Sequence, residues 1–95
     1  MQFLCNSRMA PGVTRDQVIA HFESTDASDK GWELFRAGVI SHVFWKVGER
    51  PGVAFIVSVD SEEEVRSLLQ ESSAVKLGLL EYDVDPVSPF RQFGE

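Results

Sequence analysis

The chain contains a single cysteine, Cys5, among its 95 residues. One thiol excludes an intrachain disulfide and any cysteine-rich metal site, and sparse cysteine is typical of proteins from reducing compartments. No basic residue adjoins Cys5 in the sequence to promote its ionisation. We therefore expect a buried, unreactive thiol with a packing role.

Basic residues are also scarce. Nine Lys and Arg residues face fifteen Asp and Glu residues, which gives a formal net charge of −6, and the basic residues form no cluster. Nucleic-acid binding depends on clustered positive charge, so we expect no nucleic-acid partner. The chain has no apolar run of membrane-spanning length, and its first residues lack the features of a signal peptide. A cytoplasmic protein with no membrane partner is the expectation.

Motifs that hold phosphates, metals or acyl groups are missing. The glycines are isolated turn residues, and no serine lies in a nucleophile elbow. Only two histidines occur, His21 and His42, and neither has a second ligand at metal-binding spacing. We therefore expect no metal site and no cofactor.

What the chain does contain is enough apolar sequence for one domain. The hydrophobic content is 43%, and 95 residues leave no room for a second domain. Runs rich in β-branched and aromatic residues predict strands, and amphipathic runs between them predict helices. The predicted strands cover 2–9, 39–47, 53–59 and 79–87, and the predicted helices begin near 14 and 62.

This order, β-α-β-β-α-β, predicts an α+β ferredoxin-like sandwich over residues 1–95, with a four-stranded antiparallel sheet and both helices on one face. Pro86 and Pro89 are expected to end regular structure and leave an irregular tail from about 86.

Local signals mark the ends of the predicted helices. Thr14 and Gln17 have capping-box spacing, and Asp60 and Ser61 are cap candidates before three glutamates. Polar residues over 25–31 are expected to break or kink the first helix, and Gly38 is a plausible left-handed terminator. Residues 74–77 are interpreted as a short connection.

The two central strands are apolar on both faces. Strict alternation places Trp45 on one face of the run 39–47, and Ile40, His42 and Phe44 on the other. An antiparallel sheet that met water on one side would show polar residues at alternate positions. We therefore expect a second subunit to cover the face that the helices leave open.

The sequence resembles the dimeric α+β barrel superfamily and, within it, the muconolactone isomerase-like proteins. The resemblance is carried by His42–Gly48, Val53–Val57, Ser61–Glu64 and Val75–Val84 running into Pro86 and Pro89. It implies a homodimer or higher homo-oligomer whose sheets close a barrel, and a small apolar cavity in each subunit. Proteins of this group include lactone isomerases, polyketide cyclases and cofactor-independent monooxygenases, which all handle small apolar carbon skeletons.

Three residues are candidates for proton transfer. His42 is the favoured base, because neutral imidazole accepts a proton at near-neutral pH. Tyr82 or His21 would be the hydrogen-bond partner of the oxygen on which negative charge develops. Each of the three also has a plain packing interpretation.

Four further residues are candidates for substrate binding. Trp45, Phe22 and Phe44 would form apolar walls, and Arg8 would hold a substrate carboxylate or form a surface ion pair. Glu81, Asp83 and Asp85 alternate along the last strand and are interpreted as a solvated face.

These observations predict a small cofactor-independent isomerase or cyclase. Its substrate would be a carbonyl-containing apolar metabolite, lactone or polyketide-like, and its reaction a proton transfer. The alternatives are a non-catalytic ligand-binding or accessory dimer and a cofactor-free monooxygenase.

Overall fold

The computed structural model describes residues 1–24 and 29–88. The elements follow the order β1 (Gln2–Met9), α1 (Arg15–Glu23), α2 (Asp29–Arg36), β2 (Ile40–Lys46), β3 (Gly52–Ser58), α3 (Glu62–Gln70), α4 (Ser73–Lys76) and β4 (Leu80–Val87). The strands form one antiparallel sheet in the order β2-β3-β1-β4. The predicted ferredoxin-like α+β fold is confirmed. Of the predicted break over 25–31, residues 25–28 lie outside the described residues and 29–31 belong to α2; residues 89–95 of the predicted tail also lie outside the described residues.

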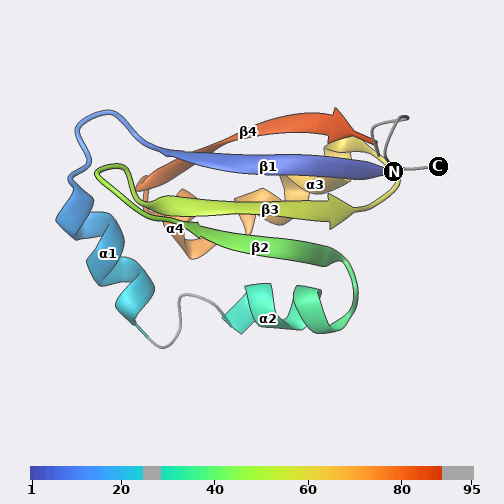
Figure 1. Cartoon of the computed structure of the whole chain (residues 1–95), viewed down its shortest axis with the longest axis horizontal. Coiled ribbons are helices and arrows are strands. Elements are labelled where there is room, and N and C mark those ends of the chain that lie inside the picture. Colours follow the sequence, from blue (N-terminus) through green and yellow to red (C-terminus); the bar gives the residue numbers. More distant parts are fainter. Residues whose placement is uncertain (25–28, 89–95) are drawn as a thin grey trace.

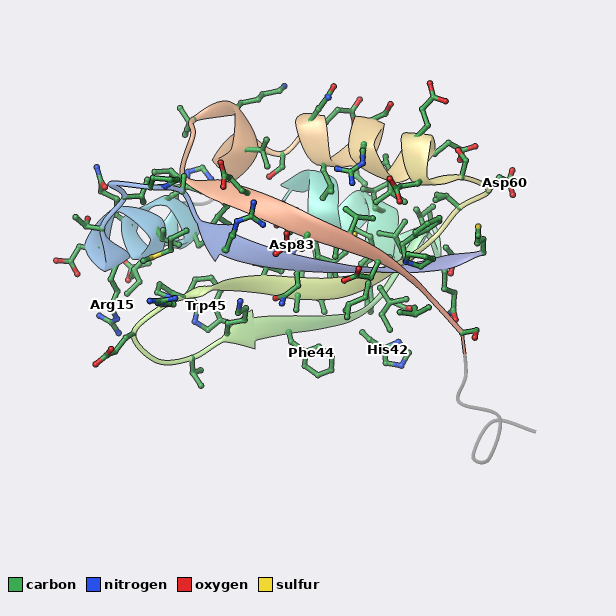
Figure 2. The ribbon with its side chains drawn as sticks, turned by 90° about the horizontal axis from the view of Figure 1, so that it is seen from above. Arg15, His42, Phe44, Trp45, Asp60 and Asp83 are labelled. Atoms are coloured by element: carbon green, nitrogen blue, oxygen red, sulfur yellow. The ribbon has the colours of Figure 1, made fainter. Side chains whose placement is uncertain are left out.

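The described helices all lie on one side of the sheet. Figure 1 shows α3 and α4 behind it, α2 alongside the edge strand β2, and α1 at the end of the sheet where β1 finishes. Among residues 1–24 and 29–88, no helix is long and apolar enough to cross a membrane. The opposite side of the sheet, which we call the open face, carries no described helix (Figure 2).

The predicted helix ends are confirmed in detail. Thr14 and Gln17 form a complete capping box, in which the Gln17 N–H donates to Thr14 Oγ1 at 3.3 Å and the Thr14 N–H donates to Gln17 Oε1 at 2.8 Å. Ser61 caps α3 through the Glu64 N–H at 3.3 Å. Gly38 follows α2 with φ +79°, a conformation that glycine adopts without a steric penalty.

Two predictions at element boundaries were wrong. Residues 73–76 form the short helix α4 and not a plain connection, because four residues are too few to show a helical period in the sequence. Pro86 lies inside β4, which ends at Val87 as the predicted strand 79–87 does, so the irregular tail does not begin at 86. A proline is tolerated there because β4 is an edge strand and need not donate a ladder hydrogen bond on its outer side.

Side chains between the sheet and the helices form two buried clusters. The larger contains Phe3, Cys5, Ile40, Val57, Val65 and Leu69. The smaller contains Val18 of α1, Ala74 of α4 and Leu80 of β4, all 1% exposed or less. The smaller cluster fixes α1 and α4 against the same end of the sheet, where the candidate site lies.

A β-bulge in β2 changes which side chains share a face. Ser41 pairs with Ile56 and Phe44 with Ala54, so His42 and Val43 together oppose the single residue Phe55. His42 has φ +54°, a left-handed conformation that few non-glycine residues adopt.

The bulge overturns the strict alternation predicted for this strand. Ile40 is buried on the helix side and Trp45 contacts α1, so these two residues share a face. Phe44 lies on the open face (Figure 2). The prediction that Ile40, His42 and Phe44 share one face was therefore wrong, because one inserted residue reverses the alternation beyond it.

The β1–β3 ladder ends at a close contact between Ser7 and Gly52. The paired register ends at Asn6 and Ala54, and the next amide, Val53 N–H, donates to the buried Ser7 Oγ at 2.8 Å. A Cβ on Gly52 would lie 2.2 Å from that oxygen. Only glycine leaves room for the Ser7 hydroxyl to take the place of a ladder acceptor.

We expect Gly52→Ala to lower the free energy of unfolding by about 2–3 kcal/mol, because the new methyl group displaces the Ser7 hydroxyl and breaks its bond to Val53. Urea denaturation followed by circular dichroism measures the change. Gly31→Ala is the matched control: nothing lies within 4 Å of its added Cβ and it lies within α2, so alanine there is expected to stabilise the protein by up to about 1 kcal/mol. Equal effects of the two substitutions would contradict the steric explanation.

Candidate functional site

His21 lies in the last turn of α1 and is joined to α4 by its side chain. Its Nε2 lies 2.9 Å from Ser73 Oγ, a hydrogen bond between residues 52 positions apart in the sequence. The imidazole is half-buried. A hydrogen bond between side chains of two different helices holds a ring in one orientation far better than solvent does.

Two aromatic rings extend from His21 toward β2. The Phe22 ring packs edge-on against His21 at 5.1 Å between centroids and against Trp45 at 5.3 Å. Figure 2 shows Trp45 at the end of the sheet nearest α1. We call His21, Phe22, Trp45 and Ser73 the aromatic cluster.

Tyr82 of β4 lies on the same side of the sheet. It packs against the Val18, Ala74 and Leu80 cluster, as Phe22 does, and its ring lies 5.7 Å from that of Phe55. Burial, with a smaller contribution from the Cys5 charge, raises the pKa of Tyr82 to about 12. The phenol therefore stays protonated, and is a hydrogen-bond donor, at any physiological pH.

Cys5 is fully buried in the larger core cluster, as the sequence predicts. Burial raises the pKa of the Cys5 thiol to about 11, and the Arg66 charge only partly opposes this. A thiol that stays protonated at neutral pH is a poor nucleophile.

His42 lies on the other side of the sheet from Tyr82. Its side chain is exposed, points away from the helices (Figure 2), and its Nδ1 lies 3.1 Å from Oγ of the adjacent Ser41. Tyr82 packs between sheet and helices. The two residues therefore do not face a common space within one subunit, and the predicted pairing of His42 with Tyr82 in one subunit does not occur. His21 is on the Tyr82 side.

Phe44 and Arg8 also lie on the open face, away from the aromatic cluster. Phe44 is 61% exposed and points outward from β2 (Figure 2). Arg8 binds Glu81 at 3.3 Å and forms a close ion pair with Asp83. The hydrogen bond to Asp83 raises the pKa of Arg8 above its ordinary value. Arg8 thus forms the surface ion pair that was one of its two predicted roles.

Lys46 and Ser73 are two polar residues that sequence reasoning missed. The Lys46 ammonium crosses from β2 to β1, where it donates to the Ser7 carbonyl at 2.7 Å and to Asn6 Oδ1 at 3.1 Å. Ser73 meets His21 only because α1 and α4 pack on the same cluster. No motif or local spacing in the sequence indicates either contact.

Other features of the described residues do not add to this site. A groove of about 560 Å³ lies between α2 and α3, lined by Leu34, Val39, Val59, Ser61, Glu63, Glu64, Ser67, Leu68 and Glu71. None of the predicted site residues lines it. Within residues 1–24 and 29–88, no group of three or more His, Cys, Asp or Glu side chains is placed to hold a metal ion.

Comparison with known proteins identifies the fold but no family. No protein-family model matches the sequence, and no curated protein matches it. Solved structures with this fold include the 5-chloro-2-hydroxyhydroquinone dehydrochlorinase TftG from Burkholderia phenoliruptrix AC1100, in complex with 2,5-dihydroxybenzoquinone. The likeness covers 98% of this chain and 99% of that chain, with a TM-score of 0.71 and 20% sequence identity. At this identity the likeness establishes the ferredoxin-like fold alone.

Proposed function

We propose that this chain is a small enzyme that isomerises or cyclises a carbonyl-containing ring compound by proton transfer at the aromatic cluster. The observation that carries the proposal is the half-buried His21, held by Ser73 and flanked by the Phe22 and Trp45 rings. An oriented imidazole beside flat apolar surfaces suits a base that acts on a flat, mostly apolar substrate.

In the proposed reaction, neutral His21 accepts a proton from a carbon next to the substrate carbonyl. The electron pair of the broken C–H bond moves into the ring and places negative charge on the carbonyl oxygen. Tyr82, which its raised pKa keeps protonated, donates a hydrogen bond to that oxygen. Return of the proton from His21 to a different carbon completes an isomerisation. In a cyclisation the carbanion attacks a second carbonyl carbon of the substrate, the π electrons of that carbonyl move onto its oxygen, and return of the proton from His21 to this alkoxide completes the reaction.

The solved neighbour supports the choice of ring compounds as substrates. Its name gives a chlorinated hydroxyhydroquinone as the compound on which it acts, and its bound ligand is a dihydroxybenzoquinone. Removal of HCl from such a ring also requires that a proton leave the substrate, so a base of the same kind would serve. Lactones, hydroxylated quinones and polyketide-like aromatics therefore form the substrate panel for this chain.

We also infer that a second copy of the chain covers the open face. This face exposes Phe44 and partly exposes Leu4, Ala54 and Ile56, with the Arg8 ion pairs beside them. A chain of 95 residues buries a smaller share of its surface than a larger domain does, so covering this apolar surface would add considerably to its stability. Packing of the two open faces against each other would form the homodimeric barrel that the sequence resemblance implies.

Deuterium exchange tests the proton-transfer proposal even when the product is unidentified. The protein is incubated in D₂O with each member of the panel, and ¹H NMR follows the signal of the carbon-bound proton next to the carbonyl. We expect enzyme-dependent exchange or conversion for at least one ring compound. Saturable binding of a panel member without exchange or conversion would instead favour the non-catalytic ligand-binding role.

A further inference from the structure

Ser73 makes a hydrogen bond with one particular nitrogen of the His21 ring. The Ser73 hydroxyl lies 2.9 Å from His21 Nε2, and no side-chain cap bond is made by its neighbour Ser72. A serine hydroxyl can either accept a hydrogen bond from Nε2–H or donate one to the Nε2 lone pair. The two arrangements correspond to the two tautomers of neutral imidazole.

The backbone on both sides of this hydrogen bond is anchored by one core contact. Val18 precedes His21 by one helical turn, Ala74 follows Ser73 directly, and these two buried residues pack in the same cluster. The edge-on Phe22 ring adds a second contact to the imidazole. Both partners therefore lie on elements that are anchored in the same buried cluster.

We propose that Ser73 is a positioning residue that accepts a hydrogen bond from His21 Nε2–H and so leaves the reactive lone pair on Nδ1. The choice between the two tautomers rests on the proposed function. A general base should gain a proton without breaking the hydrogen bond that orients it. A hydroxyl that accepts from Nε2–H keeps this hydrogen bond when the imidazole becomes a cation. A hydroxyl that donated to Nε2 would leave a proton on Nδ1, and His21 could then accept a proton only after that bond broke.

The tautomer is measured directly by ¹⁵N NMR of the imidazole at about pH 9, where an ordinary histidine is neutral. In the wild-type protein we expect Nε2 to resonate as a pyrrole-type nitrogen and Nδ1 as a pyridine-type nitrogen. In Ser73→Ala both shifts should move toward the average of two exchanging tautomers. A pyrrole-type Nδ1 in the wild type, or an unchanged spectrum in Ser73→Ala, would overturn the proposal.

Two further variants separate positioning from general stability. Ser72→Ala removes a neighbouring hydroxyl that makes no cap bond and should leave the wild-type spectrum intact. Ser73→Thr keeps the hydroxyl and should restore the wild-type tautomer. If Ser72→Ala also shifts the ¹⁵N signals toward the tautomer average, while circular dichroism shows full helix content, the effect belongs to α4 as a whole. That result would contradict a specific role of Ser73.

Turnover provides the second measurement. With a substrate found in the exchange assay, Ser73→Ala should lower kcat by about 10- to 100-fold while KM changes less than about twofold, because the imidazole is misoriented but the Phe22 and Trp45 rings stay in place. An unchanged kcat would contradict positioning. The ¹⁵N spectrum can be measured whether or not the protein is active. If the spectrum shows the expected tautomer but no panel compound is exchanged or converted, the role of Ser73 is supported and the proposed reaction is refuted.

Discussion

His21→Gln should lower the rate of proton exchange by about 10²- to 10⁴-fold, the contribution typical of a positioned general base. Glutamine is of similar length and can still bond to Ser73, but it cannot accept a proton at neutral pH. KM should change little, because the Phe22 and Trp45 rings remain in place. Initial rates of exchange or conversion, measured on folded protein, give the result.

His42→Gln is the matched control for this substitution. His42 is exposed on the open face, and its side-chain hydrogen bond is to the adjacent Ser41, so its loss should leave the rate within about twofold. The opposite pattern, in which His42→Gln is inactive and His21→Gln is active, would return the role of base to His42. It would also mean that the open face forms part of the site.

Phe44→Asp should convert the protein from a dimer to a monomer. If a second copy covers the open face, the substitution removes a large apolar contact and places an unpaired carboxylate in the interface. The two effects together are worth about 3 kcal/mol or more, so the dissociation constant of the dimer should rise by at least about 100-fold. Sedimentation velocity across a range of concentrations measures the change.

Leu77→Asp provides the control for a charge placed on any exposed apolar residue. Leu77 is 66% exposed and follows α4, outside the open face. The Leu77→Asp substitution should therefore leave the dimer intact. A wild-type protein that sediments as a 10.6 kDa monomer at micromolar concentration would refute the dimer itself, whatever the variants do.

Helix ends and strand identities were predictable because they depend on neighbouring residues. The Thr14 capping box, the Ser61 cap and the left-handed Gly38 were all visible in the sequence and all occur. Strand β1 was predicted with its observed bounds. Backbone hydrogen bonds at a cap, and alternation along a strand, are satisfied within a few residues and leave a local signal.

The faces of β2 were not predictable in the same way. In a β-bulge one strand has an extra residue opposite a single residue of its partner, here in β2 opposite β3. The bulge is therefore a property of the strand pair. The run that contains His42 shows no glycine or other local sign of the irregularity. Strict alternation along this run therefore could not show that His42 lies on the open face, on the other side of the sheet from Tyr82.

The sequence alone determined the ferredoxin-like fold and a short list of aromatic and ionisable candidates, because periodicity and capping act over a few residues. Only the tertiary structure decided which candidates meet. Packing of Val18 against Ala74 brings His21 to Ser73, and the bulge turns Trp45 toward Phe22 while Phe44 stays on the open face. Contacts between residues 52 positions apart depend on how whole elements pack, and no local pattern encodes them.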